Sequence, residues 1–510
     1  MSSTKGLFQR FIALVCVFLL LFGACIAEDP NAEPEDPIVA QWIRQAESGD
    51  GWAMAELGVY YSTLGEWEKA RDYIHAALEN GCNVFHNIAS FYMLPGNPYA
   101  DVEKALEFTM QGIEYGDMNN CVVLGQMYEG GIFGAPDYAA AAELYRQAAD
   151  AGVEYAYFCM GIVYAKDRYG IMDYEQAVKW YEKAAAAGNA SAMVNLSSMY
   201  TKKKYGMVDI EKELEWAVKA EQAGKESIKA ELDAIPEGTF AAGCRDYFRE
   251  EYAKAAAAME KASLDGDARA MRYLGRMYRE GDLGDPDNQA AIAWYLKAVE
   301  AGDSVAPYSL GMMYWLPEFG MYDLEKAENW FLKAIDKEYV PSYTAMAMLQ
   351  EEKGSIEAAT QWYIMAAERG ETIAMHNLGC NALAQSDLDA AIQWFSMASE
   401  AGKAQSAHNL GCIYRDMLAD LDAAEQAFLQ GAQLGFLPSM NSLGVIMVET
   451  GRIGEGIRWI TRAAERGQES AKNNLVYIYS TPEYGIYQPQ EAEYWRKRMI
   501  LKLSCDKILI

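Results

Sequence analysis

Histidines and closely spaced cysteines are scarce in this chain, and their scarcity argues against several classes of enzyme. Only four histidines occur in 510 residues, and the seven cysteines after Cys25 show no close spacing typical of zinc or redox motifs. No glycine-rich phosphate loop follows a strand, and the sequence pattern indicates no strand at all. The single Ser-x-x-Lys, from Ser504 to Lys507, lacks the further motifs of a penicillin-recognising enzyme. We therefore predict a protein that is not an enzyme and needs no cofactor or metal.

Positive charge is also in short supply. The chain has 44 Lys and Arg against 73 Asp and Glu, which gives a formal net charge of -29. Such a charge repels nucleic-acid backbones and anionic lipid surfaces, so we expect neither as a direct partner. The simplest interpretation of the acidic excess is that it keeps the protein soluble.

Long apolar runs are absent except for one near the start. Lys5 and Arg10 precede twelve uninterrupted apolar residues from Phe11 to Phe22, and the small residues Gly23 and Ala24 follow. This is the pattern of a signal peptide, and the run is too short to span a bilayer as a stable helix. We therefore predict an exported protein whose mature form has no transmembrane helix.

The residues from Leu21 to Cys25 resemble a bacterial lipobox, in which the cysteine becomes the lipid-bearing first residue after cleavage. The resemblance implies a signal peptide over residues 1–24 and lipidation at Cys25. Residues 25–37 are acidic and rich in proline, so we expect an extended tether there. The predicted location is the cell envelope or periplasm. Cleavage after Ala27, which would give a soluble secreted protein, is the alternative.

Glycines recur with a period of 32 to 36 residues, which indicates stacked supersecondary units. A first glycine follows an Ala-rich helix, because glycine takes the left-handed conformation of a helix C-cap without steric cost. A second glycine comes nine residues later inside a helix, where it costs about 1 kcal/mol relative to alanine, so we expect a close helix–helix contact there. The first glycines are Gly49, Gly81, Gly116, Gly152, Gly188, Gly224, Gly266, Gly302, Gly370, Gly402, Gly435 and Gly467, with Glu338 in one slot. The second glycines are Gly58, Gly125, Gly161, Gly275, Gly311, Gly379, Gly411 and Gly444.

Two motifs accompany these glycines. The first helix of a repeat reads Leu-Gly-x-x-Tyr, and the second reads Ala-x-x-Trp-Tyr-x-x-Ala-Ala, as from Ala177 to Ala185. The tryptophans recur in register with small alanines, so we expect them to fill the gap to the next repeat and not to bind a ligand. Over residues 38–498 the two motifs resemble Sel1-like repeats, a subclass of tetratricopeptide-like repeats. The resemblance implies an all-α, right-handed α-solenoid of about 12–13 helix-turn-helix repeats that binds other proteins.

One interval departs from the period. The predicted sub-arrays cover residues 38–224 and 266–488, and residues 225–265 form an irregular repeat that lacks Leu-Gly-x-x-Tyr. We expect a bend between Lys225 and Gly238, because Pro236 interrupts a helix there. Residues 489–510 should form a capping helix, because a terminal repeat must cover an otherwise exposed face.

In tetratricopeptide-like solenoids the exposed face of the first helix lines a concave groove. By helical spacing, this face holds the residues six and three before the second glycine and one and four after it. Guanidinium groups bind carboxylates bidentately, so arginines in these slots predict an anion site with an aromatic wall. The alternative is a solvated face balanced by Asp267 and Glu280. The predicted residues are Arg269, Arg272, Arg276, Arg279, Tyr308, Met312 and Trp315.

His376 and His408 occupy the same slot in consecutive repeats, three residues before Gly379 and Gly411. Two ligands do not make a metal site, so we predict a polar lining for the groove.

Together these patterns predict a scaffold, anchored by lipid at Cys25, whose groove binds a protein or peptide segment, with acidic segments among the candidates. Membrane contact is expected only through the lipid. The alternative is a cell-wall protein that binds or hydrolyses glycans or β-lactams through aromatic and carboxylate side chains. A third interpretation is an adaptor of a eukaryotic secretory pathway.

Overall fold

The computed structural model describes residues 37–482, 485 and 488–505. The predicted signal peptide, Cys25 and most of the tether lie outside these residues. Every regular element within them is helical, so the predicted all-α solenoid of helix-turn-helix repeats is confirmed. None of the described helices combines the length and apolar character that a bilayer crossing requires.

The chain divides into two compact units, residues Met1–Ile235 and Pro236–Ile510. The helices of the first unit are α2 (Pro37–Glu47), α3 (Gly51–Thr63), α4 (Trp67–Glu79), α5 (Phe85–Met93), α6 (Val102–Glu114), α7 (Asn119–Glu129), α8 (Tyr138–Asp150), α9 (Glu154–Ala165), α10 (Tyr174–Ala186), α11 (Ala190–Thr201), α12 (Ile210–Gln222) and α13 (Glu226–Asp233). Those of the second unit are α14 (Phe240–Phe248), α15 (Tyr252–Leu264), α16 (Ala268–Glu280), α17 (Asn288–Glu300), α18 (Ala306–Trp315), α19 (Leu324–Ile335), α20 (Pro341–Glu352), α21 (Ile356–Ala367), α22 (Thr372–Ala384), α23 (Leu388–Glu400), α24 (Ala404–Cys412), α25 (Leu421–Gln433), α26 (Leu437–Glu449), α27 (Ile453–Glu465), α28 (Glu469–Ser480) and α29 (Pro489–Cys505).

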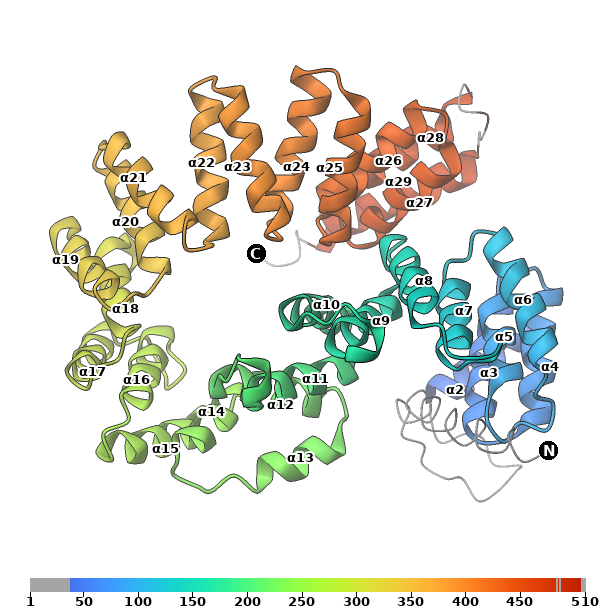
Figure 1. The fold of residues 1–510 in the computed structure, drawn as a ribbon, viewed down its shortest axis with the longest axis horizontal. Coiled ribbons are helices and arrows are strands. Elements are labelled where there is room, and N and C mark those ends of the chain that lie inside the picture. Colours follow the sequence, from blue (N-terminus) through green and yellow to red (C-terminus); the bar gives the residue numbers. More distant parts are fainter. Residues whose placement is uncertain (1–36, 483–484, 486–487, 506–510) are drawn as a thin grey trace. The chain divides into compact units, whose positions relative to one another are not determined.

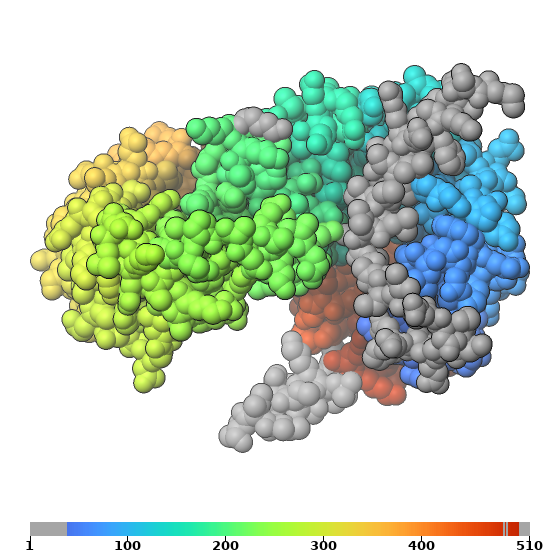
Figure 2. All heavy atoms as spheres, turned by 90° about the horizontal axis from the view of Figure 1, so that it is seen from below, coloured from blue at the N-terminus to red at the C-terminus, as the bar shows by residue number. Residues whose placement is uncertain are grey.

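Neighbouring helices form antiparallel pairs, and within each unit a pair packs against the next one along the chain (Figure 1). We call the first helix of a pair the A helix and the second the B helix. The described residues form thirteen such pairs, from α3/α4 to α28/α29, while α2 and α13 stand outside the pairing. The pairs from α14 to α19, yellow-green to yellow, merge into one continuous surface in the space-filling view (Figure 2).

Local chemistry fixes where the helices end and begin. Glu338, which replaces a glycine in the first slot, has a φ of 58°. Its backbone therefore adopts the left-handed conformation that glycine takes in the other repeats. B helices commonly begin at an aspartate whose carboxylate caps the first turn; Asp173, for example, accepts from the backbone N–H groups of Glu175 and Gln176. The backbone N–H of Asp173 also donates to the carbonyl of Tyr164, which closes the loop between the helices.

The second glycine makes room for an aromatic ring of its own repeat. A Cβ atom on Gly125 of α7 would lie 2.6 Å from Cε1 of Tyr145 on α8, and that tyrosine is only 2% exposed. The tyrosine or phenylalanine that follows the motif tryptophan is therefore the residue that requires the glycine. The tryptophans themselves are half-buried and pack on the preceding repeat, as Trp330 does against the cluster around Tyr295.

The interval over residues 225–265 holds the isolated helix α13 and the pair α14/α15. Gly243 of α14 takes the role of a second glycine, because a Cβ there would lie 2.7 Å from the methyl carbon of Met259. This pair does not fit Leu-Gly-x-x-Tyr, because the tyrosine of α14, Tyr247, comes four residues after the glycine and not three. Near the other end, Trp495 of α29 is 3% exposed and joins the core formed by α25 to α28.

Candidate functional site

The four predicted arginines lie on α16, and acidic side chains of the chain itself surround them. Arg269 pairs with Asp267 at 2.8 Å and stacks over the ring of Phe240, with its guanidinium carbon 4.2 Å from the ring centre. Arg276 and Arg279 both pair with Glu280, at 3.1 and 2.7 Å. An external anion would have to compete with these carboxylates, which agrees with the alternative that the face is balanced by its neighbours.

Glu280 is the centre of this cluster. Its carboxylate also accepts a hydrogen bond of 3.1 Å from the hydroxyl of Tyr247. Burial raises the pKa of Glu280, but the hydrogen bonds and charges of Arg279 and Arg276 outweigh burial and hold it below its usual value. The carboxylate is therefore ionised at neutral pH and neutralises part of the arginine charge.

Arg272 has a different role, because it connects two repeats. Its Nε lies 3.1 Å from Oδ2 of Asp303, and the side chains are only 15% and 4% exposed. The other oxygen of Asp303 accepts from the backbone N–H groups of Val305 and Ala306 at the start of α18, at 2.9 and 2.7 Å. One carboxylate thus caps an A helix and binds the preceding A helix.

Other polar residues three positions before the second-glycine slot also link one A helix to the next. His376 lies 2.8 Å from the hydroxyl of Ser406 on α24, and His408 lies 3.3 Å from that of Ser439 on α26. His86 of α5 and Asp117 form an equivalent pair at 2.8 Å. The two histidines predicted as groove lining are half-buried and hydrogen-bond successive A helices to one another.

The predicted aromatic wall of α18 also packs against its neighbours. The ring of Tyr308 lies 5.2 Å from that of Tyr339, and Met312 packs on the core formed by α19 and α20. Trp315 donates through Nε1 to Glu352 at 2.6 Å, and Tyr322 bonds to the same carboxylate. The structure therefore places most of the predicted residues against adjoining helices of the second unit and Arg279 against Glu280 of its own helix, and the anion site itself stays a prediction.

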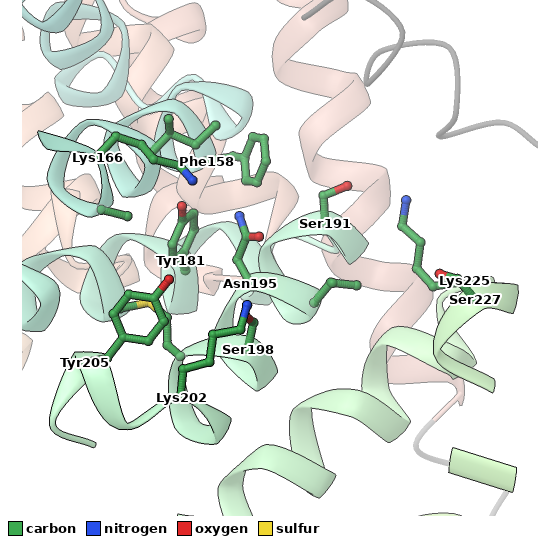
Figure 3. A pocket seen from close by; sticks show the side chains of 14 residues that line it. Phe158, Lys166, Tyr181, Ser191, Asn195, Ser198, Lys202, Tyr205, Lys225 and Ser227 are labelled. Atoms are coloured by element: carbon green, nitrogen blue, oxygen red, sulfur yellow. The ribbon is translucent and has the colours of Figure 1, made fainter. Parts of the chain in front are cut away.

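A pocket of about 500 Å³ opens instead in the first unit, over α9, α11 and the start of α13 (Figure 3). The pocket lies on the face that the helical spacing predicts for the groove. In α9 the second glycine is Gly161, and in α11 Ser197 occupies the same slot, so six of the groove positions counted from these two residues line the pocket. In both helices the position three before that slot is apolar, Phe158 and Val194, so the polar link between A helices that occurs elsewhere is missing here. The six groove positions are Phe158, Ile162, Ala165, Ser191, Val194 and Ser198.

Three lysines line this pocket together with neutral hydrogen-bonding groups. Lys166, Lys202 and Lys225 form no ion pair with any carboxylate in the described part of the chain, and none of the lining residues is acidic. In Figure 3 the ammonium groups of Lys166 and Lys202 point toward the middle of the pocket. Burial raises the pKa of the Tyr181 hydroxyl on its wall, although a hydrogen bond with Asn195 lowers it slightly, so this phenol stays neutral.

A second pocket of about 420 Å³ adjoins the first and shares Val194, Ser198 and Lys202 with it. Its lining has the opposite charge, because it includes Glu213 and Glu231. Burial raises the pKa of Glu213, although a hydrogen bond with Thr201 lowers it. We call the two adjoining pockets together the trough; no acid lines its first pocket, and two glutamates line its second.

The helical spacing gives six of the lining positions of this trough, but the arginines predicted from the sequence all lie on α16 and the lysines of the trough lie elsewhere. Lys166 and Lys202 are the C-cap residues that follow α9 and α11, and they lie 36 positions apart in equivalent places. Neither lysine occupies one of the four groove positions of a first helix, which are the positions that the four arginines occupy on α16. A search for cations just beyond each A helix would have found them, because the partial negative charge of a helix C-terminus favours lysine there.

No group of three or more His, Cys, Asp or Glu that could hold a metal ion occurs within the described ranges. Cys380 and Cys412 each lie near a histidine, with sulfur–nitrogen distances of 3.6 and 3.7 Å. Burial raises the pKa of both thiols, which favours the unreactive protonated form.

Comparison with known families and structures gives a consistent result. The family model described as "Sel1 repeat" matches seven segments of the chain: residues 121–153, 156–189, 268–303, 304–339, 348–371, 372–403 and 438–468. Among solved structures, a protective antigen of uropathogenic Escherichia coli with an SLR fold is 23% identical, covers 90% of this chain and 97% of its own, and gives a TM-score of 0.35. A Sel1 repeat protein from Oxalobacter formigenes is 24% identical over 51% of this chain and 98% of its own, with a TM-score of 0.36. Yeast Tom70 is 13% identical over 86% and 99%, with a TM-score of 0.39. No curated protein matched the chain.

Proposed function

We propose that this chain, in which seven Sel1 repeats are found, is a non-enzymatic scaffold that binds a segment of another protein along the exposed faces of its A helices. The observation that carries the proposal is the trough over α9, α11 and α13. Its walls include six side chains at the groove positions, and Tyr181, the ring that packs against Gly161, closes part of the first pocket. Solenoids can change such surface residues without disturbing the stack, which suits protein binding.

The proposal includes export and a lipid anchor. The apolar run from Phe11 to Phe22, the small residues before Cys25 and the acidic, proline-containing stretch that follows support a lipoprotein held at the cell envelope. In this arrangement the tether spaces the repeats from the membrane. The acidic repeats themselves have no attraction for anionic lipid.

A crosslinking capture from intact envelopes tests the scaffold. Ser198→Trp places a large side chain in the wall shared by both pockets, and Gln222→Trp adds the same side chain at an exposed position of α12 outside them. We expect the native chain and Gln222→Trp to capture the same partner and Ser198→Trp, with native circular dichroism, to lose it. Equal capture by both variants would contradict the groove. A native chain that captures no protein would overturn the scaffold and favour the glycan alternative.

A further inference from the structure

We propose that the lysine side of the trough is a binding site for the carboxylate side chains of an acidic, extended peptide segment. This inference rests on the proposed scaffold function and identifies the chemistry of its partner. It moves the anion site from the arginines of α16 to the first unit.

The first support is the charge of the pocket. Lys166, Lys202 and Lys225 come from three separate segments and line one cavity, with the ammonium groups of Lys166 and Lys202 turned toward its middle and Lys225 at its edge (Figure 3). None of the three forms an ion pair with a carboxylate among the described residues. The arginines of α16, by contrast, are engaged by Asp267 and Glu280. In a chain with a net charge of -29, cations left without acidic partners are the groups most available to an external anion.

Hydrogen-bonding groups complete the site. Ser191, Ser198 and Ser227 contribute hydroxyl groups, and Asn195 contributes an amide, around the ammonium groups. Carboxylate oxygens accept several hydrogen bonds at once, and those from charged donors are the stronger ones. The wall therefore offers both charge and directional donors to a carboxylate.

The shape favours an extended chain over a compact small molecule. The two pockets share Val194, Ser198 and Lys202, which follow one another along one face at and just beyond α11, so an extended segment that crosses this face can reach both pockets. Glu213 and Glu231 in the second pocket repel further acidic groups. We therefore expect a segment whose acidic residues are followed by neutral or basic ones, bound in one direction only.

A purely structural role for the lysines makes a different prediction. Lys166 and Lys202 are the C-cap residues of their helices, where a cation is favourable without any ligand. If this were their only role, replacing them would reduce the stability of the fold and leave peptide binding unchanged once the protein is folded.

Fluorescence anisotropy with the full mature chain separates the two roles. The probe is a labelled peptide with three consecutive glutamates followed by neutral residues, and its partner probe carries glutamines instead. We expect the glutamine peptide to bind at least about tenfold more weakly, and Lys166→Ala/Lys202→Ala/Lys225→Ala to weaken the glutamate peptide by a similar factor, about 1.4 kcal/mol. The matched control Lys179→Ala/Lys229→Ala/Lys337→Ala removes the same charge from exposed positions outside the pockets and should change affinity less than about twofold. Equal losses in both triple variants, or equal binding of both peptides, would overturn the inference.

Two further measurements define the ligand. Glu213→Gln/Glu231→Gln should strengthen binding of an all-glutamate peptide several-fold, because it removes like charges from the second pocket. Free glutamate or inorganic phosphate that displaces the probe at the concentration of the peptide itself would overturn the peptide and leave a small-anion site. If Ser198→Trp loses the captured partner while the triple lysine variant keeps it, the lysine chemistry is wrong and the scaffold stands.

Discussion

Gly161 of α9 lies directly against Tyr181 of α10, so that a Cβ atom on the glycine would be 2.3 Å from Cδ1 of the ring. Tyr181 is 2% exposed and also forms part of the pocket wall. The same relationship between a glycine and a buried ring recurs along the chain, which shows that it is the means by which an A helix approaches its B helix. The other pairs are Gly125 with Tyr145, Gly275 with Tyr295, Gly311 with Phe331, Gly379 with Phe395, and Gly411 with Phe428.

Gly161→Ala should therefore destabilise the protein, although alanine is the better helix former. The methyl group must push the ring out of its site, and overpacking of this kind costs about 1–3 kcal/mol, which exceeds the gain of about 1 kcal/mol in helix propensity. Gly454→Ala is the control, because a Cβ there would have nothing within 4 Å; it should be neutral or slightly stabilising. Chemical denaturation followed by circular dichroism measures both. A stabilised Gly161→Ala would show that the ring does not need this space.

Asp303→Asn should weaken the link between α16 and α18. The amide oxygen can still cap α18, but Arg272, 15% exposed, loses the charge of its partner. Breaking a buried pair costs about 3 kcal/mol, whereas Arg276→Ser, at a side chain 43% exposed, should cost less than about 1 kcal/mol. Denaturation midpoints of the two variants provide the comparison, and equal midpoints would refute the linking role of Asp303.

The pH dependence of stability should contain a contribution from His376 and His408. Burial lowers the pKa of both, with Lys403 and Arg415 adding to the effect. The fold therefore favours the neutral rings: the stability they contribute is fully present above the unfolded pKa of about 6.5 and is lost as pH falls through the lower folded pKa. His376→Gln/His408→Gln should lose less unfolding free energy than the native chain between about pH 7.5 and 5. Equal losses would mean that these rings do not contribute.

Arg269→Ser/Arg276→Ser tests the arginine face without disturbing Arg272. Both side chains are more than two-fifths exposed and pair with acids of their own helix region, so the fold should remain intact. Because those acids already compete for the guanidinium groups, we expect partner capture from intact envelopes to be unchanged. Loss of the partner would restore the arginine face as the binding site.

Cys25→Ser should abolish lipid attachment in a bacterial host. The native chain should incorporate radiolabelled palmitate and fractionate with membranes, whereas the variant should be unlabelled. A native chain that is exported without label would favour cleavage after Ala27 and a soluble secreted form.

The periodicity of the sequence by itself determined the repeat architecture, because each repeat presents the same contacts to its neighbours and so many copies carry the same signal. The left-handed Glu338 and the groove positions followed from the same register. The register did not predict which aromatic ring packs against the second glycine. The motif places Trp and Tyr side by side, and only the packing of the helices decides which of the two is buried there.

Only the tertiary structure decided which basic side chains form ion pairs with carboxylates of the same chain. Arg272 and Asp303 are 31 residues apart, and their meeting depends on how two A helices stack. Lys166, Lys202 and Lys225 have no shared helix face, and only the fold brings them to one cavity. Whether two charges pair depends on distances of a few ångströms between segments far apart in sequence. The sequence of one helix therefore shows how many cations it carries, but not which of them are already paired with a carboxylate of the chain.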